Sequence, residues 1–160
     1  MSVDFRGVLD RFTAAVEAGD GAALGALFTE NGIYHDTFYG AFAGRRAVAV
    51  MLEERFWGDA TRFLWDMYEP VFDEAEGRGY ARWVFSYTST MEDSAGRRVV
   101  FDGMSAFLLR SGLIEHYREV FSAGVAFLQL GMSPERSDKI LRRIFDSHAG
   151  DPEWDRHRAG

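Results

Sequence analysis

The sequence predicts an α+β fold in which helices come first and an antiparallel sheet follows. Up to about residue 57, apolar side chains recur mostly at helical spacing, and from Thr61 onward the period changes to two. Four strand-like segments then follow one another, separated by short polar turns that are typical of hairpins. The 160 residues suffice for one domain with a short appendage.

The first third of the chain is expected to hold three helices and one strand. Residues 4–18 carry an apolar stripe, Gly19 ends this helix, and Asp20 can cap a second short helix. Residues 33–38 are rich in β-formers and predict a strand. A loop is expected at 40–44, and a third helix at 45–57.

The period-two region predicts an antiparallel meander of four strands, at residues 62–73, 78–91, 97–110 and 113–124. Ser133 and Pro134 then open a further helix, which stops near Gly150. This helix is expected to lie across a pocket mouth, to pack on a partner or to cover an exposed sheet edge. We divide the chain into a domain at 1–128 and a helical extension and tail at 129–160.

Composition excludes several classes of function. The net charge of −7 argues against a nucleic-acid partner, which would require a local excess of basic residues. The chain has no cysteine, and no segment reaches the ~20 apolar residues that span a bilayer, so no membrane association and a cytoplasmic location are expected. Its histidines and acids show no metal-ligand spacing, so no metal is expected. Arginine strongly outnumbers lysine, which favours a GC-rich bacterial source.

Several motifs carry a family resemblance. Phe12-Thr-Ala-Ala-Val-Glu-Ala-Gly-Asp20 is followed by Leu27-Phe-Thr-Glu-Asn-Gly32, by Ile33-Tyr-His-Asp36, and later by Phe107-Leu-Leu-Arg-Ser-Gly-Leu-Ile114. Over residues 5–125 this order resembles the nuclear-transport-factor-2-like superfamily, which includes ketosteroid isomerases, SnoaL-like polyketide cyclases, limonene-type epoxide hydrolases and scytalone dehydratases. The resemblance implies a cystatin-like cone with an internal pocket for a small apolar molecule, no cofactor, and a homodimer formed through the sheet.

The resemblance also implies roles for individual residues. Asp36 matches the proton-shuttling aspartate of the ketosteroid isomerases, but Phe12 stands where they have an oxyanion-hole tyrosine, and Ser105 stands at or near their protonated aspartate. Tyr34 and Asp36 resemble the pair that holds the nucleophilic water in limonene-type epoxide hydrolases, and Glu119 matches their last-strand aspartate. Their Arg-x-Asp pair is missing. Neither reaction is therefore expected in its standard form.

Side-chain alternation along the strands indicates which residues share a face with Asp36 and with Glu119. Tyr34 and Asp36 share one face of their strand, as Tyr117 and Glu119 do on the last strand. If both faces line an aromatic pocket, desolvation and mutual repulsion raise the pKa of one acid, leaving an acid beside a base. We predict Asp36 as general base, Glu119 as its acid partner, and Tyr34 or Tyr117 as electrophile. The predicted lining consists of Phe12, Trp65, Trp83, Ser105, Phe107 and Phe121.

Two functional hypotheses follow. The first is a cofactor-independent lyase, isomerase or hydrolase acting on a small apolar carbonyl or hydroxy compound. The alternative is a non-catalytic ligand-binding or dimerisation domain in which both acids are structural. In that case Glu119 pairs with an arginine on a neighbouring strand (Arg82, Arg97 or Arg98). His35 and His116 fall on the opposite strand face and are assigned to the surface or an interface.

Overall fold

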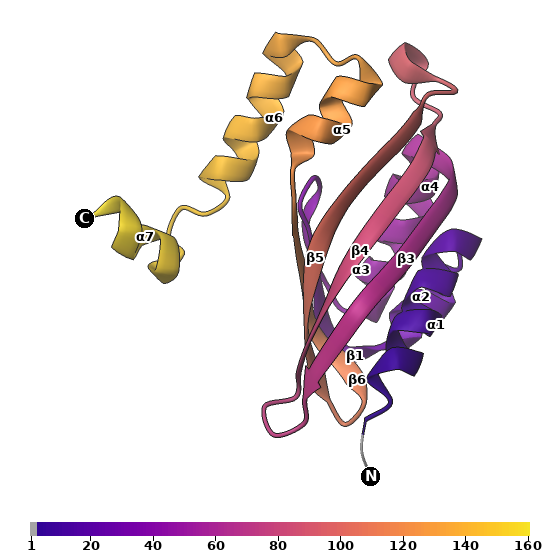
Figure 1. Cartoon of the computed structure of the whole chain (residues 1–160), viewed down its shortest axis with the longest axis vertical. Helices are drawn as coiled ribbons and strands as arrows, with labels where there is room; N and C mark the ends of the chain where they lie inside the picture. The colour runs from indigo at the N-terminus through magenta and orange to yellow at the C-terminus, as the bar shows by residue number, and fades with distance from the viewer. Residues whose placement is uncertain (1–2) are drawn as a thin grey trace.

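The computed structural model describes residues 3–160, which form one six-stranded sheet with helices packed on its inner face (Figure 1). The strand order is β2-β1-β6-β5-β4-β3. This arrangement confirms the predicted α+β class. The strands are β1 (Phe28–Asp36), β2 (Gly40–Ala43), β3 (Ala60–Asp73), β4 (Arg78–Ser89), β5 (Arg98–Arg110) and β6 (Leu113–Phe121).

The helical segments lie at both ends of the chain, after β2, and between β4 and β5. They are α1 (Phe5–Ala18), α2 (Gly21–Ala26), α3 (Arg45–Val50), the π-helical turn η1 (Met51–Phe56), α4 (Trp57–Asp59), the 3-10 turn η2 (Glu92–Ser94), α5 (Ala123–Leu130), α6 (Pro134–Asp146) and α7 (Pro152–Arg158). Within the described residues, no helix is both long enough and apolar enough to cross a membrane.

Helix α1 closes the inner face of the sheet. Asp4 begins it by accepting the backbone N–H of Gly7 at 2.9 Å, and Gly19 ends it in the left-handed conformation, at a φ of 67°. Its apolar stripe is fully buried, and Phe12 packs edge-on against Trp65 of β3 at 5.4 Å between ring centroids. The helix therefore fixes the aromatic floor beneath the sheet.

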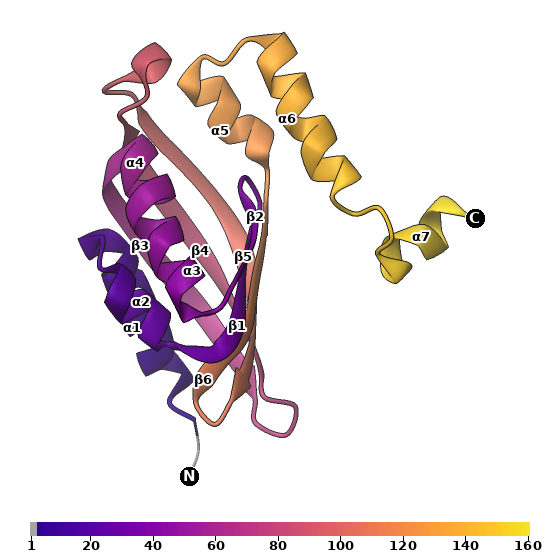
Figure 2. The same cartoon turned by 180° about the vertical axis from the view of Figure 1, so that it is seen from behind.

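Strand β3 is bent at two places. Its pairing with β4 shifts register between Thr61 and Leu64 and again between Tyr68 and Val71. Arg62 and Glu69 fall within these shifts and have positive φ values of 55° and 52°. Such bulges increase the local twist of a strand. They curve the sheet around the helices, as Figure 2 shows from behind.

The region around β1 differs from its predicted form. Strand β1 begins at Phe28 rather than at residue 33, and residues 40–43, predicted as a loop, form β2, which pairs antiparallel with β1. On its other edge β1 pairs with β6 in parallel, with Tyr34 opposite Tyr117 and His35 opposite Arg118. The first and last long strands therefore lie side by side.

The C-terminal third contains two helices that were not predicted. The final strand ends at Phe121, and the segment predicted as its continuation turns into α5, so the boundary drawn after residue 128 falls inside this helix. The tail, predicted to be loosely held, contains α7. The predicted helix from Pro134 is confirmed as α6. Figures 1 and 2 both show α6 and α7 projecting away from the helical face of the sheet.

Candidate functional site

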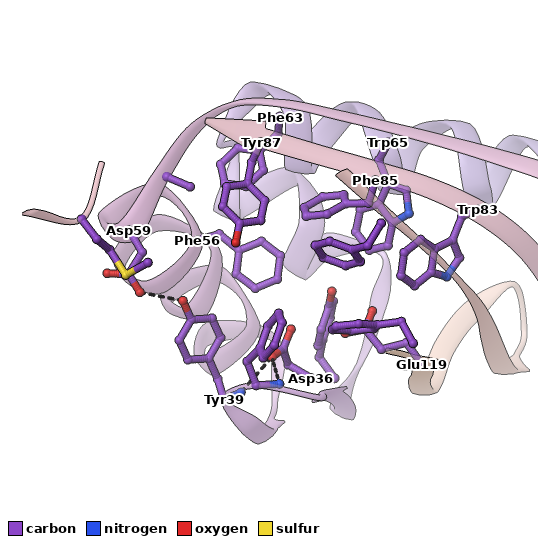
Figure 3. A pocket seen from close by; sticks show the side chains of 16 residues that line it. Asp36, Tyr39, Phe56, Asp59, Phe63, Trp65, Trp83, Phe85, Tyr87 and Glu119 are labelled. Carbon is purple, nitrogen blue, oxygen red and sulfur yellow. Dashed lines mark hydrogen bonds between the residues drawn. The ribbon is translucent and has the colours of Figure 1, made fainter. Parts of the chain in front are cut away.

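The candidate site is a cavity of about 70 Å³ between the inner face of the sheet and the segment from η1 to α4. A single water needs ~10–15 Å³ on this measure, so the cavity holds about five waters or one small ring compound. Figure 3 shows Asp36 and Glu119 on one wall, opposite Trp65, Trp83 and Phe85. Its aromatic lining is Tyr34, Phe38, Tyr39, Phe56, Phe63, Trp65, Trp83, Phe85, Tyr87, Phe101 and Phe121.

Asp36 is the last residue of β1, and only 3% of its surface is exposed. Its Oδ1 accepts the backbone N–H groups of Phe38 at 2.7 Å and Tyr39 at 2.8 Å, as aspartates commonly do at turns. Burial raises the pKa of Asp36 to about 6, although these two hydrogen bonds oppose the shift. The group therefore changes charge near neutral pH.

Glu119 reaches the same wall from β6. Because Tyr34 lies opposite Tyr117 in the parallel pairing, the next inward-facing residues on the two strands are Asp36 and Glu119. The two carboxyl groups are close enough for each to shift the pKa of the other. Burial, followed by the charge of Asp36, raises the pKa of Glu119 well above its usual range.

The surroundings of the two carboxyls decide which one holds the proton. Asp36 receives two short backbone N–H bonds, which stabilise a carboxylate. Glu119 accepts a hydrogen bond from the Tyr117 hydroxyl at 2.7 Å, but its only backbone donor among the described residues is the N–H of Thr37, at a long distance of 3.4 Å. At neutral pH we therefore assign the negative charge to Asp36 and the proton to Glu119.

A chain of hydrogen bonds approaches Glu119 from behind. The Nε1–H of Trp83 donates to Ser105 Oγ at 2.8 Å, and Ser105 Oγ lies 2.9 Å from the Tyr117 hydroxyl. An indole N–H can only donate, and Tyr117 donates to Glu119, so Ser105 must donate to Tyr117. Glu119 Oε2 thus ends the chain as an acceptor, which favours Oε1 as the protonated oxygen.

Two buried polar groups on the cavity wall have no partner at hydrogen-bonding geometry within the described residues. They are the hydroxyl of Tyr34 and the Nε1–H of Trp65. Leaving a buried polar group unpaired costs ~1–3 kcal/mol. These groups are the unused donors of the site.

The end of the cavity away from Glu119 faces solvent. Here the Tyr39 hydroxyl, on a side chain that is 39% exposed, donates to Asp59 Oδ2 at 2.6 Å (Figure 3). This bond joins the turn after β1 to α4 and narrows the entrance. Among residues 3–160, no group of three or more histidines and acids is placed to hold a metal ion.

The family of the chain follows from a sequence comparison. A family model described as a SnoaL-like domain matches residues 9–117, which is more than half of the chain. The chain belongs to the SnoaL-like domain family. No functionally curated protein matches it.

Solved structures share the fold of this SnoaL-like domain. A ketosteroid isomerase-like protein from Catenulispora acidiphila, in complex with trimethylamine, has a TM-score of 0.72 at 16% identity, over 86% of this chain and 98% of that one. An epoxide hydrolase from M. tuberculosis has a TM-score of 0.63 at 18% sequence identity, and the match covers 78% of this chain and 86% of that one. A protein of unknown function with a cystatin-like fold, from Methylobium petroleophilum, has a TM-score of 0.58 at 19% sequence identity, and the match covers 74% of this chain and 75% of that one. The fold and superfamily inferred from the motifs are confirmed.

The structure places the predicted site residues in two groups. Tyr34, Asp36, Trp65, Trp83, Glu119 and Phe121 line the cavity. The remaining four do not line it: Phe12 and Phe107 pack in the core, and Ser105 and Tyr117 form the hydrogen-bonded chain behind Glu119. Phe12 lies too deep because its ring stacks on Tyr34 at 6.0 Å and fills the space beneath the cavity.

Sequence reasoning missed part of the lining. Phe85 and Tyr87, which are absent from the predicted lining, alternate with outward residues after Trp83 and face the cavity with it. That alternation could have identified them. Asp59 and Tyr39 lie at the entrance only because α4 meets the turn after β1, a contact that no sequence pattern indicated.

The two tryptophans allow a matched test of the unpaired donor. Both Trp65→Phe and Trp83→Phe remove a buried indole, but only the second breaks a hydrogen bond and leaves Ser105 without its donor. We expect Trp83→Phe to lower the free energy of unfolding by ~1 kcal/mol more than Trp65→Phe, measured by urea denaturation. Equal losses, or a larger loss in Trp65→Phe, would contradict this assignment.

The raised pKa of Asp36 predicts a pH-dependent stability. A carboxyl whose folded-state pKa is raised contributes stability at low pH, and this is lost as pH rises from the unfolded value of 3.8 through about 6. Asp36→Asn removes the effect, so its stability relative to wild type should rise by ~2 kcal/mol between about pH 4.5 and 7.5. Urea denaturation at both pH values measures it, with the exposed Asp66→Asn on β3 as control. A difference that is independent of pH would refute the raised pKa.

Proposed function

We propose that this SnoaL-like domain is a cofactor-independent enzyme that performs general acid–base chemistry on a small, mainly apolar carbonyl or hydroxy compound. The observation that carries the proposal is the pair of buried carboxyls, Asp36 and Glu119, which shift each other's pKa on the wall of one aromatic cavity. A base and an acid side by side can remove a proton at one atom and deliver one at another.

The charge environment of the pair supports catalysis over a structural role. Within residues 3–160 neither acid forms an ion pair, and the arginines considered as partners for Glu119 are engaged elsewhere. Arg82 pairs with Glu69, and Arg98 donates to Ser86. An unpaired buried carboxylate is costly for folding and is a common feature of functional sites.

Each polar group has a distinct role in the proposal. Asp36 is the general base, and protonated Glu119 is the acid that returns a proton. Tyr117 is committed to Glu119 and acts as a positioning residue, so the hydroxyl of Tyr34 is the group available to donate to a developing oxyanion. The cavity volume of about 70 Å³ limits the substrate to roughly one ring, unless side chains at the entrance move.

Proton abstraction at carbon gives a direct test. We expect wild-type protein to accelerate hydrogen–deuterium exchange at the α-carbon of cyclohexanone in D₂O, followed by proton NMR. Asp36→Asn should lower the accelerated rate by ~10²–10⁴-fold, because the general base is lost. Asp66→Asn, on the outer side of β3, should leave the rate unchanged.

The outcome separates the two functional hypotheses. If wild-type protein does not exceed the buffer rate, or if Asp36→Asn equals wild type, the acid–base proposal fails. A binding domain without turnover would instead hold cyclohexanone in the aromatic cavity and show no exchange. Chemical-shift changes in the indole N–H signals of Trp65 and Trp83 would report such binding.

We also propose that two copies associate through the outer face of the sheet. Large apolar side chains are exposed there on three strands of the sheet, including Leu64 on β3, Val100 and Met104 on β5, and Val120 on β6. Met104 lies opposite Val120 and Arg82 in the register, so the face mixes apolar and charged groups as interfaces do.

Introducing a charge into this face should separate the copies. In light scattering coupled to size exclusion, wild type is expected at twice the chain mass of 18.1 kDa, and Met104→Asp at the mass of one chain. Ala75→Asp adds the same charge in the exposed turn between β3 and β4 and should leave the dimer intact. A wild-type protein that elutes as a single chain would disprove the dimer.

A further inference from the structure

A second cavity, of about 260 Å³, lies between the outer side of the β1–β6 pair and the C-terminal end of α6. We call it the outer cavity. Its basic lining comes from two sources: His35 on β1 and Arg118 on β6 are direct cross-strand neighbours, and Arg143 and His148 come from α6 and the segment after it. Side-chain alternation explains why β1 and β6 present acids inward and bases outward.

One side-chain hydrogen bond joins the two sides of the outer cavity. Arg143 Nη2 donates to the backbone carbonyl of Phe38 at 2.8 Å, which places the end of α6 over the turn after β1. Helix α6 has no fully buried residue, so few other contacts hold it there. The two basic pairs therefore face one another across a cavity that a small molecule can enter.

Among the described residues, the two arginines of the outer cavity have no ion-pair partner. Within residues 3–160, neither Arg118 nor Arg143 forms an ion pair, and His148 has only Asp151, at 3.9 Å. The carboxyls of Asp36 and Glu119 belong to the common wall, but Asp36 accepts the backbone N–H groups of Phe38 and Tyr39, and Glu119 accepts the hydroxyl of Tyr117. The cluster is conspicuous in a chain whose net charge is −7.

The electrostatics of His35 point the same way. Its pKa is lowered by burial and then by the positive charges of Arg118, His116 and His148. The pKa of His116 is likewise lowered by burial and by Arg118, and Glu115 only partly opposes this. An anion placed among these groups would relieve their mutual repulsion.

We propose that the outer cavity binds the oxyanion group, a carboxylate or phosphate, of a small organic molecule, gripped by Arg118 from the sheet and Arg143 from α6. Guanidinium groups match both oxyanions through paired N–H donors. Ile144, Val120 and Phe121 give the cavity an apolar side, which accommodates the organic part. The ligand bridges two elements that otherwise share few contacts and fastens α6 to the sheet.

The proposal does not rest on catalysis in the inner cavity, because none of the four basic residues lines that cavity. Occupancy of the outer cavity can be measured without knowing any substrate. Inorganic phosphate and benzoate serve as probes, and the chloride salt at matched ionic strength controls for general screening.

The test is a titration of each probe into wild-type and variant proteins, followed by nitrogen–proton NMR and by the melting temperature. We expect saturable binding of at least one probe, with shifts concentrated in α6 and at Thr37–Tyr39, and a rise in melting temperature. Arg118→Gln and Arg143→Gln should each weaken binding by about tenfold or more, because a charge-assisted hydrogen bond is lost. The probe that binds shows whether the cavity takes a phosphate or a carboxylate.

Arg142→Gln is the matched control. Arg142 directly precedes Arg143 on α6, but it pairs with Asp138 at 2.7 Å and does not line the outer cavity. It should bind the probe as wild type does. Circular dichroism verifies that all three variants are folded. Absence of saturable binding of both probes to wild type, or equal weakening in Arg142→Gln and Arg118→Gln, overturns the proposal.

Discussion

The parallel pairing of β1 with β6 is the constraint on which the rest of the site depends. With Tyr34 opposite Tyr117, the next inward residues are Asp36 and Glu119, and the outward residues between them are His35 and Arg118. A slip of one residue in either strand would turn its acid outward and its base inward. One register therefore creates the acid pair inside the sheet and the basic pair outside it.

The acid pair persists because its surroundings divide the charge unequally. Two backbone N–H groups favour the carboxylate of Asp36, while Glu119 holds the proton and avoids a second buried charge. This arrangement still costs stability at neutral pH, since the carboxylate of Asp36 is buried without a cation. A well-packed apolar pair would stabilise the sheet more, and such local conflicts are expected where a fold serves a function.

The sequence was sufficient for the features that depend on local period. Alternation predicted the inward faces of β1 and β6, and the helical stripe predicted α1, because each depends on a single element. Residues 40–43 were predicted as a loop and 123–124 as strand, and 125–130 were given no element, because short apolar runs fit a strand, a loop edge or a helix. Only their tertiary contacts decide between these. The sequence pattern also does not show how deep in the core a side chain lies. Phe12 and Phe85 are both aromatic residues on buried faces, yet Phe12 packs beneath the cavity and Phe85 lines it.

The two cavities meet at the turn after β1 and at the end of β6. Phe38 donates its N–H to Asp36 Oδ1, while its carbonyl accepts Arg143 from α6, so the same residue contacts the inner base and the outer helix. Asp36, Phe38, Tyr39, Glu119 and Phe121 line both cavities. Because the N–H of Phe38 helps to keep the charge on Asp36, a movement of α6 that displaces Phe38 must also alter the stability of that charge. The position of α6 and the protonation of the inner acid are therefore physically linked.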